Sequence, residues 1–331
     1  MREFLPLVPR SFGLDFSDRS LKLCLLDTKG RNAISFGEVD VPQGIVENGE
    51  VKNAAELGRA IREGVRTAHG ATLPRYCVGA LPDEKAFVQV VQLPVMPSVG
   101  RKEIRSAIAF QAETYIPYPI DTVYFDFEVL PFLGVRVDHS DVLIAAIPRA
   151  VVEPYMEAAR VAGITFSLLE LESFSLCRAL IRGGFSPVPV LVLDIGATRT
   201  GFVVFFGSSV RFTASIGVSA ESCKTASGLS DLVKHVKRYL LYYNAHAPHV
   251  HAKGSGGDID TMIVCGGGSM VKGIAPALSS ELDIAVRVGD PWVNIHWPRT
   301  REIPPVSREE SLRYAVALGL ALKATRLAPF L

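Results

Sequence analysis

The sequence predicts an α/β protein with two similar lobes that face each other across a cleft, and three observations lead to this fold class. Residues 14–26 and 193–206 repeat one pattern: an apolar strand that ends in Asp, a turn of small or polar residues, and a second apolar strand. An apolar strand at 262–265 runs directly into three glycines. The chain has 331 residues, which is long enough for two domains with large cores.

The first lobe core is expected over residues 11–81 together with 166–186. Apolar or alternating segments with β-branched side chains favour strands, and apolar side chains at helical spacing favour a helix. In order, the expected elements are strands at 11–27 and 33–41, a helix at 54–69, a strand at 75–81, a strand at 168–171 and a helix at 172–182.

Residues 82–165 are expected to form a subdomain inserted into the first lobe, because the character of the sequence changes at Pro82. A helix at 100–115 carries an apolar stripe and ends before Pro117 and Pro119, since proline cannot continue a helix. In order, the expected elements are a strand at 87–93, this helix, strands at 124–130 and 141–147, and a helix at 149–162.

The second lobe is expected over residues 187–331, after the junction Pro187-Val188-Pro189. Its helix at 229–245 has a strong apolar stripe, and its lysines and arginine lie on the solvated face. After the second hairpin, the expected elements are a strand at 210–216, this helix, a strand at 259–265, a helix at 269–279, a strand at 285–288 and a closing helix at 311–325.

Composition excludes several classes of function. The formal net charge of +1, with 21% charged residues, gives no electrostatic drive toward nucleic acid or an acidic membrane surface. No apolar run is long enough to span a bilayer, and residues 1–10 lack the pattern of a signal peptide. Five scattered cysteines without metal spacing indicate a reducing cytoplasm and no disulfides.

The two Asp-containing turns predict a phosphate clamp. Small residues let backbone N–H groups approach an anion closely. Four hydroxyls add side-chain donors: Ser17, Ser20, Thr198 and Thr200. Asp15 and Asp194 are expected to hold Mg²⁺ through water, because Mg²⁺ keeps much of its hydration shell. The alternative is two ordinary β-hairpins with turn-favouring Asp, Gly and Ser.

The glycine turn is the third element of the predicted nucleotide site. Gly266, Gly267 and Gly268 with Ser269 follow a buried strand, a common way to bring backbone flat against a ring or a phosphate. The same residues also suit a plain tight turn. The sequence has neither a Rossmann Gly-x-Gly-x-x-Gly after this strand nor a Walker Gly-Lys-Ser/Thr.

The order of hairpin, insert, hairpin, glycine turn and closing helix resembles the superfamily of actin, the heat-shock chaperone ATPases and the sugar kinases. Over nearly its whole length the chain most resembles the type IV pilus assembly family of PilM, relatives of the division protein FtsA. The segments that carry this resemblance are 13–22, 42–49, 93–97, 112–119, 264–269 and 317–321. It implies a two-lobed actin-like (ribonuclease H-like) fold with an FtsA/PilM-type insert, whose lobes close over ATP and Mg²⁺.

Two departures from the family pattern predict that nucleotide binding is weakened or lost. Ser17 and Asp18 stand where the first phosphate loop usually has Gly-Ser, which adds a Cβ and a negative charge that Arg19 partly offsets. The segment between 216 and 229 is much shorter than in the family, so the outer part of the second lobe, 217–258, is expected to be reduced. The resemblance implies this nucleotide site: Asp15, Ser17, Arg19, Ser20, Asp194, Gly196, Ala197, Thr198, Thr200, Glu221, Lys224, Gly266, Gly267, Gly268 and Ser269.

The resemblance implies a cytoplasmic scaffold of the type IV pilus assembly platform, held at the inner membrane by a protein partner. The expected partner is the N-terminal cytoplasmic tail of a PilN-like membrane protein, docked between the insert and its parent lobe, with the pilus motor ATPases as further partners. Enzymatic activity is expected to be a weak ATPase at most. Two alternatives stay open: an active ATPase or small-molecule kinase, in which Glu170 or Glu172 orients the attacking group, and an FtsA-like filament former.

Overall fold

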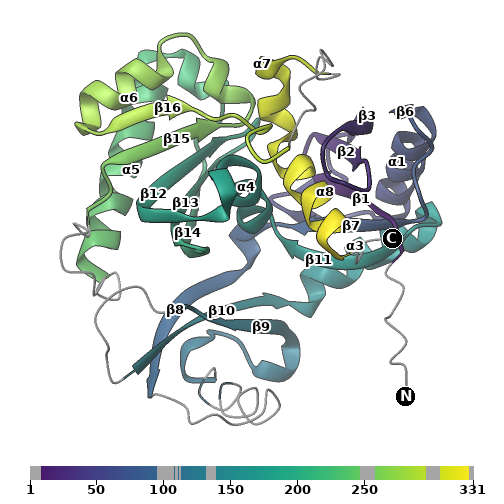
Figure 1. The fold of residues 1–331 in the computed structure, drawn as a ribbon, viewed down its shortest axis with the longest axis horizontal. Helices are drawn as coiled ribbons and strands as arrows, with labels where there is room; N and C mark the ends of the chain where they lie inside the picture. Colours follow the sequence, from purple (N-terminus) through teal and green to yellow (C-terminus); the bar gives the residue numbers. More distant parts are fainter. Residues whose placement is uncertain are drawn as a thin grey trace. The chain divides into compact units, whose positions relative to one another are not determined.

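A computed structural model describes residues 9–94, 108, 111, 113–131, 139–246, 258–295 and 306–327. The chain divides into two compact units, and each is built around its own sheet (Figure 1). Unit 1 comprises Met1–Pro82, Glu153–Arg182 and Asp290–Leu331, and unit 2 comprises Asp83–Val152 and Gly183–Gly289.

Unit 1 contains a six-stranded sheet. From one edge to the other, its strands are β11 (Thr165–Leu171), β7 (Tyr76–Leu81), β1 (Ser11–Phe16), β2 (Ser20–Leu26), β3 (Ala33–Asp40) and β6 (His69–Gly70). The first three are parallel, and the remaining pairs are antiparallel. A separate small hairpin joins β4 (Val46–Glu47) to β5 (Glu50–Val51). The helices are α1 (Ala54–Thr67), most of α3 (Arg149–Ala162), α4 (Glu172–Leu180), α7 (Arg308–Ser311) and α8 (Ala315–Leu327).

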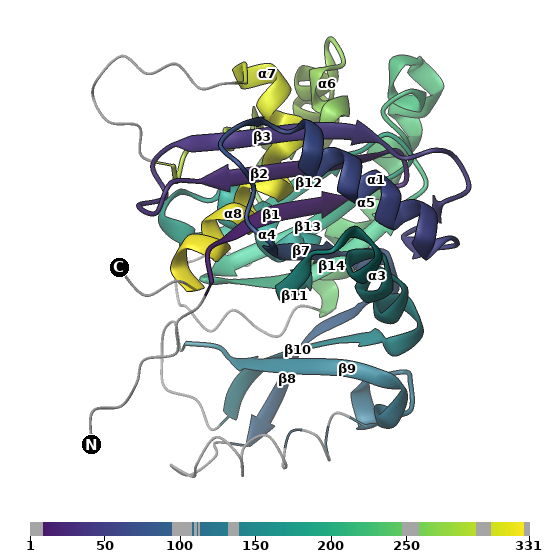
Figure 2. The ribbon, with the colours of Figure 1, turned by 90° about the vertical axis from the view of Figure 1, so that its right-hand side faces the viewer.

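Helices α1 and α8 cover opposite faces of this sheet, as Figure 2 shows. Side chains alternate along β2, so Leu23 and Cys24 point to opposite faces. Cys24 packs in a buried cluster with Ala317 and Leu318 of α8. Leu23 lies against Gly64 of α1, where an ideal Cβ would approach Leu23 Cδ1 to 2.9 Å. Burial on both faces explains why most residues of β1 and β2 are apolar.

Unit 2 contains an eight-stranded sheet. From one edge to the other, its strands are β16 (Ala285–Val288), β15 (Thr261–Cys265), β12 (Ser186–Ile195), β13 (Thr200–Gly207), β14 (Ser209–Ile216), β8 (Phe87–Pro94), β10 (His139–Pro148) and β9 (Val123–Val129). Helices α5 (Ala226–His246) and α6 (Ile274–Leu282) contribute to the core of β12, β13 and β15. Because β12 and β15 are parallel, Asp194 and Cys265 at their carboxyl ends are ladder partners.

The inserted strands join the second sheet through a narrow seam. In the described part of the chain, β8 pairs with β14 at one position, between Gln89 and Phe212. Arg211 of β14 reinforces this seam, because its Nη1 lies 3.8 Å from Asp141 Oδ2 of β10. Its Nε donates to the carbonyl of Phe206 of β13 over 3.2 Å, which holds the side chain in place. Burial lowers the pKa of Arg211 and is opposed mainly by Asp141.

Most expected strands and helices are present with shifted ends, and the short strands β4, β5 and β6 were not expected. The helix expected from residue 269 begins at Ile274, because Gly267–Met270 forms a 3₁₀ turn and Gly273 has a positive φ of 85°. The closing helix is preceded by α7 and a 3₁₀ turn at Leu312–Tyr314. Of the helix expected at 100–115, residues 108, 111 and 113–115 are helical, and the others lie outside the described residues.

Residues 290–331 were expected in the second lobe, but they belong to unit 1. Trp292, Leu318 and Leu322 are buried against Cys24 and Leu26 of β2, which explains this placement. The inserted residues 83–152 in turn belong to unit 2 rather than to unit 1. The lobe boundaries expected from the sequence therefore differ from the packing units, and the lobes themselves stay a prediction.

No helix among the described residues has the length and apolar character that crossing a membrane requires. The helices instead direct their apolar sides to the two sheets. In unit 1, Ala317, Leu320 and Ala321 of α8 are almost completely buried. In unit 2, Leu232 and Val236 of α5 lie in the main core cluster. The long apolar runs of the sequence are thus accounted for by core packing.

All five cysteines are buried, and none is in a disulfide. Burial raises the pKa of Cys24 to about 12 and also raises the pKa of Cys77 and Cys223, because a low-dielectric environment disfavours the thiolate. We therefore expect a thiol reagent at about pH 8 to label none of them in the folded protein and all of them after denaturation with guanidinium. Rapid labelling of the folded protein would show that the cores are looser than described.

Candidate functional site

The first predicted phosphate turn, between β1 and β2, is closed by its own side chain. The Ser17 hydroxyl donates to the carbonyl of Ser20 over 2.9 Å, and its oxygen accepts from the N–H groups of Ser20 at 3.0 Å and Arg19 at 3.4 Å. The Ser17 N–H also donates to the Ser20 carbonyl over 2.9 Å. The backbone donors that were expected to face a phosphate are thus directed at a protein oxygen.

Asp18 has a different role from the one expected. Its carboxylate accepts from the N–H of Gly49 at 3.1 Å and that of Asn48 at 3.3 Å, at the tip of the β4–β5 hairpin. Asn48 and Gly49 both have positive φ, and Tyr155 of α3 donates to the Gly49 carbonyl over 2.9 Å. Asp18 therefore fixes a neighbouring turn, and Arg19 reaches toward Gln43 with a long contact of 3.5 Å.

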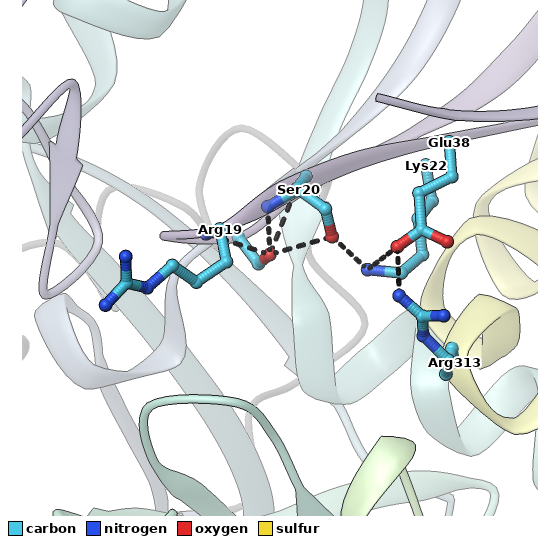
Figure 3. Close-up of polar contacts among 6 residues, drawn as sticks. Arg19, Ser20, Lys22, Glu38 and Arg313 are labelled. Atoms are coloured by element: carbon cyan, nitrogen blue, oxygen red, sulfur yellow. Dashed lines mark hydrogen bonds and ion pairs between the residues drawn. The ribbon is translucent and has the colours of Figure 1, made fainter. Parts of the chain in front are cut away.

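Lys22 lies beside this turn, and the sequence analysis did not select it. Asp15, Lys22 and Glu38 are successive ladder partners on β1, β2 and β3, so they form one row across the sheet. The Lys22 Nζ donates to Ser20 Oγ over 2.8 Å and lies 3.9 Å from Glu38 Oε1, and Arg313 reaches the same Glu38 oxygen at 2.5 Å (Figure 3). A lone lysine in the apolar strand Leu21-Lys22-Leu23 was the available sequence signal.

The second predicted turn, between β12 and β13, is also held by internal bonds. The Gly196 N–H donates to the Arg199 carbonyl and the Ala220 N–H to the Gly196 carbonyl, both over 2.8 Å. Thr200 is buried, and its hydroxyl donates to the Val218 carbonyl over 2.7 Å. Ala197 at the tip is exposed, and Thr198 is half-buried.

Arg199 is a second residue that the sequence analysis did not select. It forms an ion pair with Glu84, in the 3₁₀ turn Asp83–Lys85 that precedes β8. The two side chains are only 20% and 15% exposed, so the pair is largely desolvated. Within unit 2, the tip of the second hairpin is therefore tied to the start of the inserted strands. A basic residue in a turn of small residues could have indicated it.

The glycine turn packs tightly on the second hairpin within unit 2. An ideal Cβ on Gly266 would lie 2.2 Å from Asp194 Oδ1, and one on Gly268 would lie 2.2 Å from Ile195 Cγ2. Gly266 also has a positive φ of 74°. Ser269 is buried, and its hydroxyl donates to the Gly266 carbonyl over 2.7 Å. Close contacts within the chain thus explain why positions 266 and 268 require glycine, without a ligand.

Glu221 and Lys224 form an ion pair with each other on the surface of unit 2. Their closest atoms are 2.5 Å apart, and the side chains are 79% and 59% exposed. Glu221 precedes the 3₁₀ turn Ser222–Lys224 that leads into α5, and Lys224 is the last residue of this turn. Contact of these two residues with a ribose or base stays a prediction.

Glu170, one of the two candidate catalytic carboxylates, is paired within unit 1. Arg178 binds it in a bidentate manner, with Nη2 at 2.8 Å from Oε2, and also donates to the Gly319 carbonyl at 3.2 Å. The Glu170 and Arg178 side chains are 12% and 15% exposed. Glu172 is in the first turn of α4, where a carboxylate suits the helix dipole. Both positions favour a structural role over proton transfer.

The fit of these residues to a magnesium-bound nucleoside triphosphate differs between the units. In unit 1 the donors of the turn and the charge of Lys22 are met by protein oxygens, so the first turn does not fit a phosphate chain. In unit 2 the glycine turn brings the backbone close to Asp194, and this part is compatible with a ligand. Among the described residues, no three His, Cys, Asp or Glu side chains gather as a metal site. Magnesium at Asp15 and Asp194, which lie in different units, stays a prediction.

Comparison with known proteins places these features in a family. A family model described as type IV pilus assembly protein PilM matches residues 13–216 and 229–325. The match spans both hairpins, the insert, the glycine turn and α8. It breaks at 217–228, where the sequence predicts a shortened connection.

Solved structures show the same fold. A PilM-PilN type IV pilus biogenesis complex matches with a TM-score of 0.81 at 24% identity, over 96% of this chain and 99% of that one. MreB 5 of Spiroplasma citri bound to AMPPNP matches with a TM-score of 0.51 at 10% identity, over 94% of this chain and 95% of that one. The ethanolamine utilization protein EutJ from Carboxydothermus hydrogenoformans matches with a TM-score of 0.50 at 14% identity, over 97% of this chain and 93% of that one. The fold class expected from the sequence is confirmed.

Proposed function

The chain belongs to the PilM family of type IV pilus assembly proteins and has their actin-like fold, and from this we propose that it is a scaffold that binds the cytoplasmic tail of a PilN-like inner-membrane protein. That contact would hold it at the cytoplasmic face of the inner membrane. The pilus motor ATPases are a further expected partner. An extended tail of this kind binds through groove burial and main-chain hydrogen bonds rather than through catalytic chemistry.

One observation carries this proposal: the family match includes the insert as well as both hairpins, and the structure with a TM-score of 0.81 was solved as a PilM-PilN complex. The local chemistry supports the same role. Hydroxyls of both predicted phosphate turns and of the glycine turn bond to the chain itself. The carboxylate of Glu170 is held by Arg178. These residues support a binding protein over an enzyme with rapid turnover.

We further propose that nucleotide is at most a weak ligand and that any ATPase activity is slow. Unit 2 keeps the elements that favour a nucleotide, namely Asp194 and the turn at 266–269. Unit 1 presents a turn whose donors are already used. We therefore expect partner binding to be independent of MgATP.

The proposal is tested with a fluorescent peptide that has the N-terminal tail sequence of the PilN-like protein encoded in the same genome. We expect saturable binding in the micromolar range by fluorescence anisotropy, with the Kd unchanged within about twofold by MgATP. A scrambled peptide of the same composition is the matched control and should not saturate. Equal binding of the two peptides, or none of either, would overturn the scaffold proposal.

A further inference from the structure

We infer that the first phosphate turn carries its own ligand: Ser17 and Glu38 supply the oxygens that a phosphate chain would otherwise supply. This inference rests on the proposed function only in treating residues 17–20 as a phosphate turn. It concerns which residues of this chain decide nucleotide affinity, and it does not depend on the partner tail. All the residues involved lie in unit 1.

The Ser17 oxygen occupies the centre of the turn. The N–H groups of Ser20 and Arg19 converge on it at 3.0 Å and 3.4 Å, the arrangement by which consecutive backbone donors hold an anion. Ser20 Oγ lies 3.4 Å from the same oxygen. A phosphate oxygen that used these donors would have to displace the Ser17 hydroxyl. Because the hydroxyl is part of the chain, it competes at every ligand concentration.

Glu38 pairs with the cations beside the turn, just as Ser17 bonds to the backbone donors of the turn. Lys22 is buried, and its ammonium lies between Ser20 Oγ at 2.8 Å and Glu38 Oε1 at 3.9 Å. Arg313 contacts the same Glu38 oxygen at 2.5 Å (Figure 3). The Glu38 side chain is 21% exposed, so water screens it poorly. A polyanion that approached Lys22 would meet the negative charge of Glu38 as well.

The ligand class excluded by this arrangement is a polyphosphate, whether free or as part of a nucleoside triphosphate. Removing the hydroxyl and the negative charge releases two N–H groups from the Ser17 oxygen and two cations from Glu38 without adding a new group. The chain should therefore bind phosphate more tightly once the Ser17 hydroxyl and the Glu38 carboxylate are removed. Ordinary packing residues of a hairpin have no such property.

The experiment measures binding of tripolyphosphate and of MgAMPPNP to the full chain by titration calorimetry. We expect Ser17→Gly/Glu38→Gln to bind both at least tenfold more tightly than the unmodified chain. Ser17→Ala, which keeps the Cβ but lacks the hydroxyl, and Glu38→Gln alone should each gain about threefold. The single variants also keep the test valid if the double variant does not fold.

Glu63→Gln is the matched control, because it removes the same charge from an exposed ion pair with Arg66 in the same unit. It should leave phosphate binding unchanged. If no Ser17 or Glu38 variant binds more tightly than the unmodified chain, or if Glu63→Gln gains as much, the inference is wrong. Binding of the partner tail is measured on the same samples, so failure of the scaffold proposal is seen separately.

Discussion

Replacing Gly319 with Ala is expected to lower the free energy of unfolding of unit 1 by about 2 kcal/mol or more, although Ala favours a helix by about 1 kcal/mol. Gly319 lies in α8, where an ideal Cβ would be 1.9 Å from the carbonyl oxygen of Ser175 in α4. The neighbour is backbone, so the two helices must separate to admit a methyl group. Because α8 also packs on β1, this separation would loosen the centre of unit 1.

The measurement is urea unfolding followed by tryptophan fluorescence. Trp292 lies in the buried cluster of unit 1 that includes Leu318 of α8, so its fluorescence reports the unfolding of this unit. Arg326→Ala, an exposed change in the same helix, is the control and should shift stability by less than about 0.5 kcal/mol. Equal midpoints for the two variants would contradict the close approach of α8 and α4.

Among changes to polar residues, Arg178→Ala is expected to have the largest effect and to lower the free energy of unfolding of unit 1 by about 3 to 5 kcal/mol. This change leaves the carboxylate of Glu170, whose side chain is only 12% exposed, without its bidentate partner, and it removes a donor from the Gly319 carbonyl. An unpaired buried charge costs far more than the net value of the pair, because its desolvation is no longer offset. The two predictions concern one region, so their effects should not be additive.

Arg160→Ala is the matched control for this prediction, since Arg160 pairs with Glu157 in the same unit but with side chains 75% and 46% exposed. Arg160→Ala should lower the free energy of unfolding by less than about 0.5 kcal/mol, because solvent screens the pair. Arg178→Met with Glu170→Gln should recover much of the stability lost in Arg178→Ala, since no charge remains buried. Similar losses for Arg178→Ala and Arg160→Ala would show that the Glu170 pair is solvated. Glu170 would then again be a candidate for catalysis.

Local patterns were sufficient for most elements of this fold, but not for the short strands β4, β5 and β6. The two hairpins, the helix at 54–67 and the helix at 149–162 follow from side chains that are close in sequence, because strand and helix periodicity depend only on neighbours. The pattern did not reveal where α8 packs. Its apolar surface suits either sheet, and contacts with Cys24 and Leu26, about three hundred residues earlier, decide the placement.

For the candidate site too, the sequence predicted the local features and the tertiary structure decided the contacts. The sequence by itself determined which segments carry Asp, glycine and hydroxyl groups at turns, and with them the family to which the chain belongs. Only the tertiary structure decided the partners of those groups: Ser17 for the backbone of its own turn, Asp18 for Gly49, and Glu170 for Arg178. The physical reason is that a polar side chain bonds to whatever lies within about 3 Å of it, and chain topology, not local sequence, brings those atoms together.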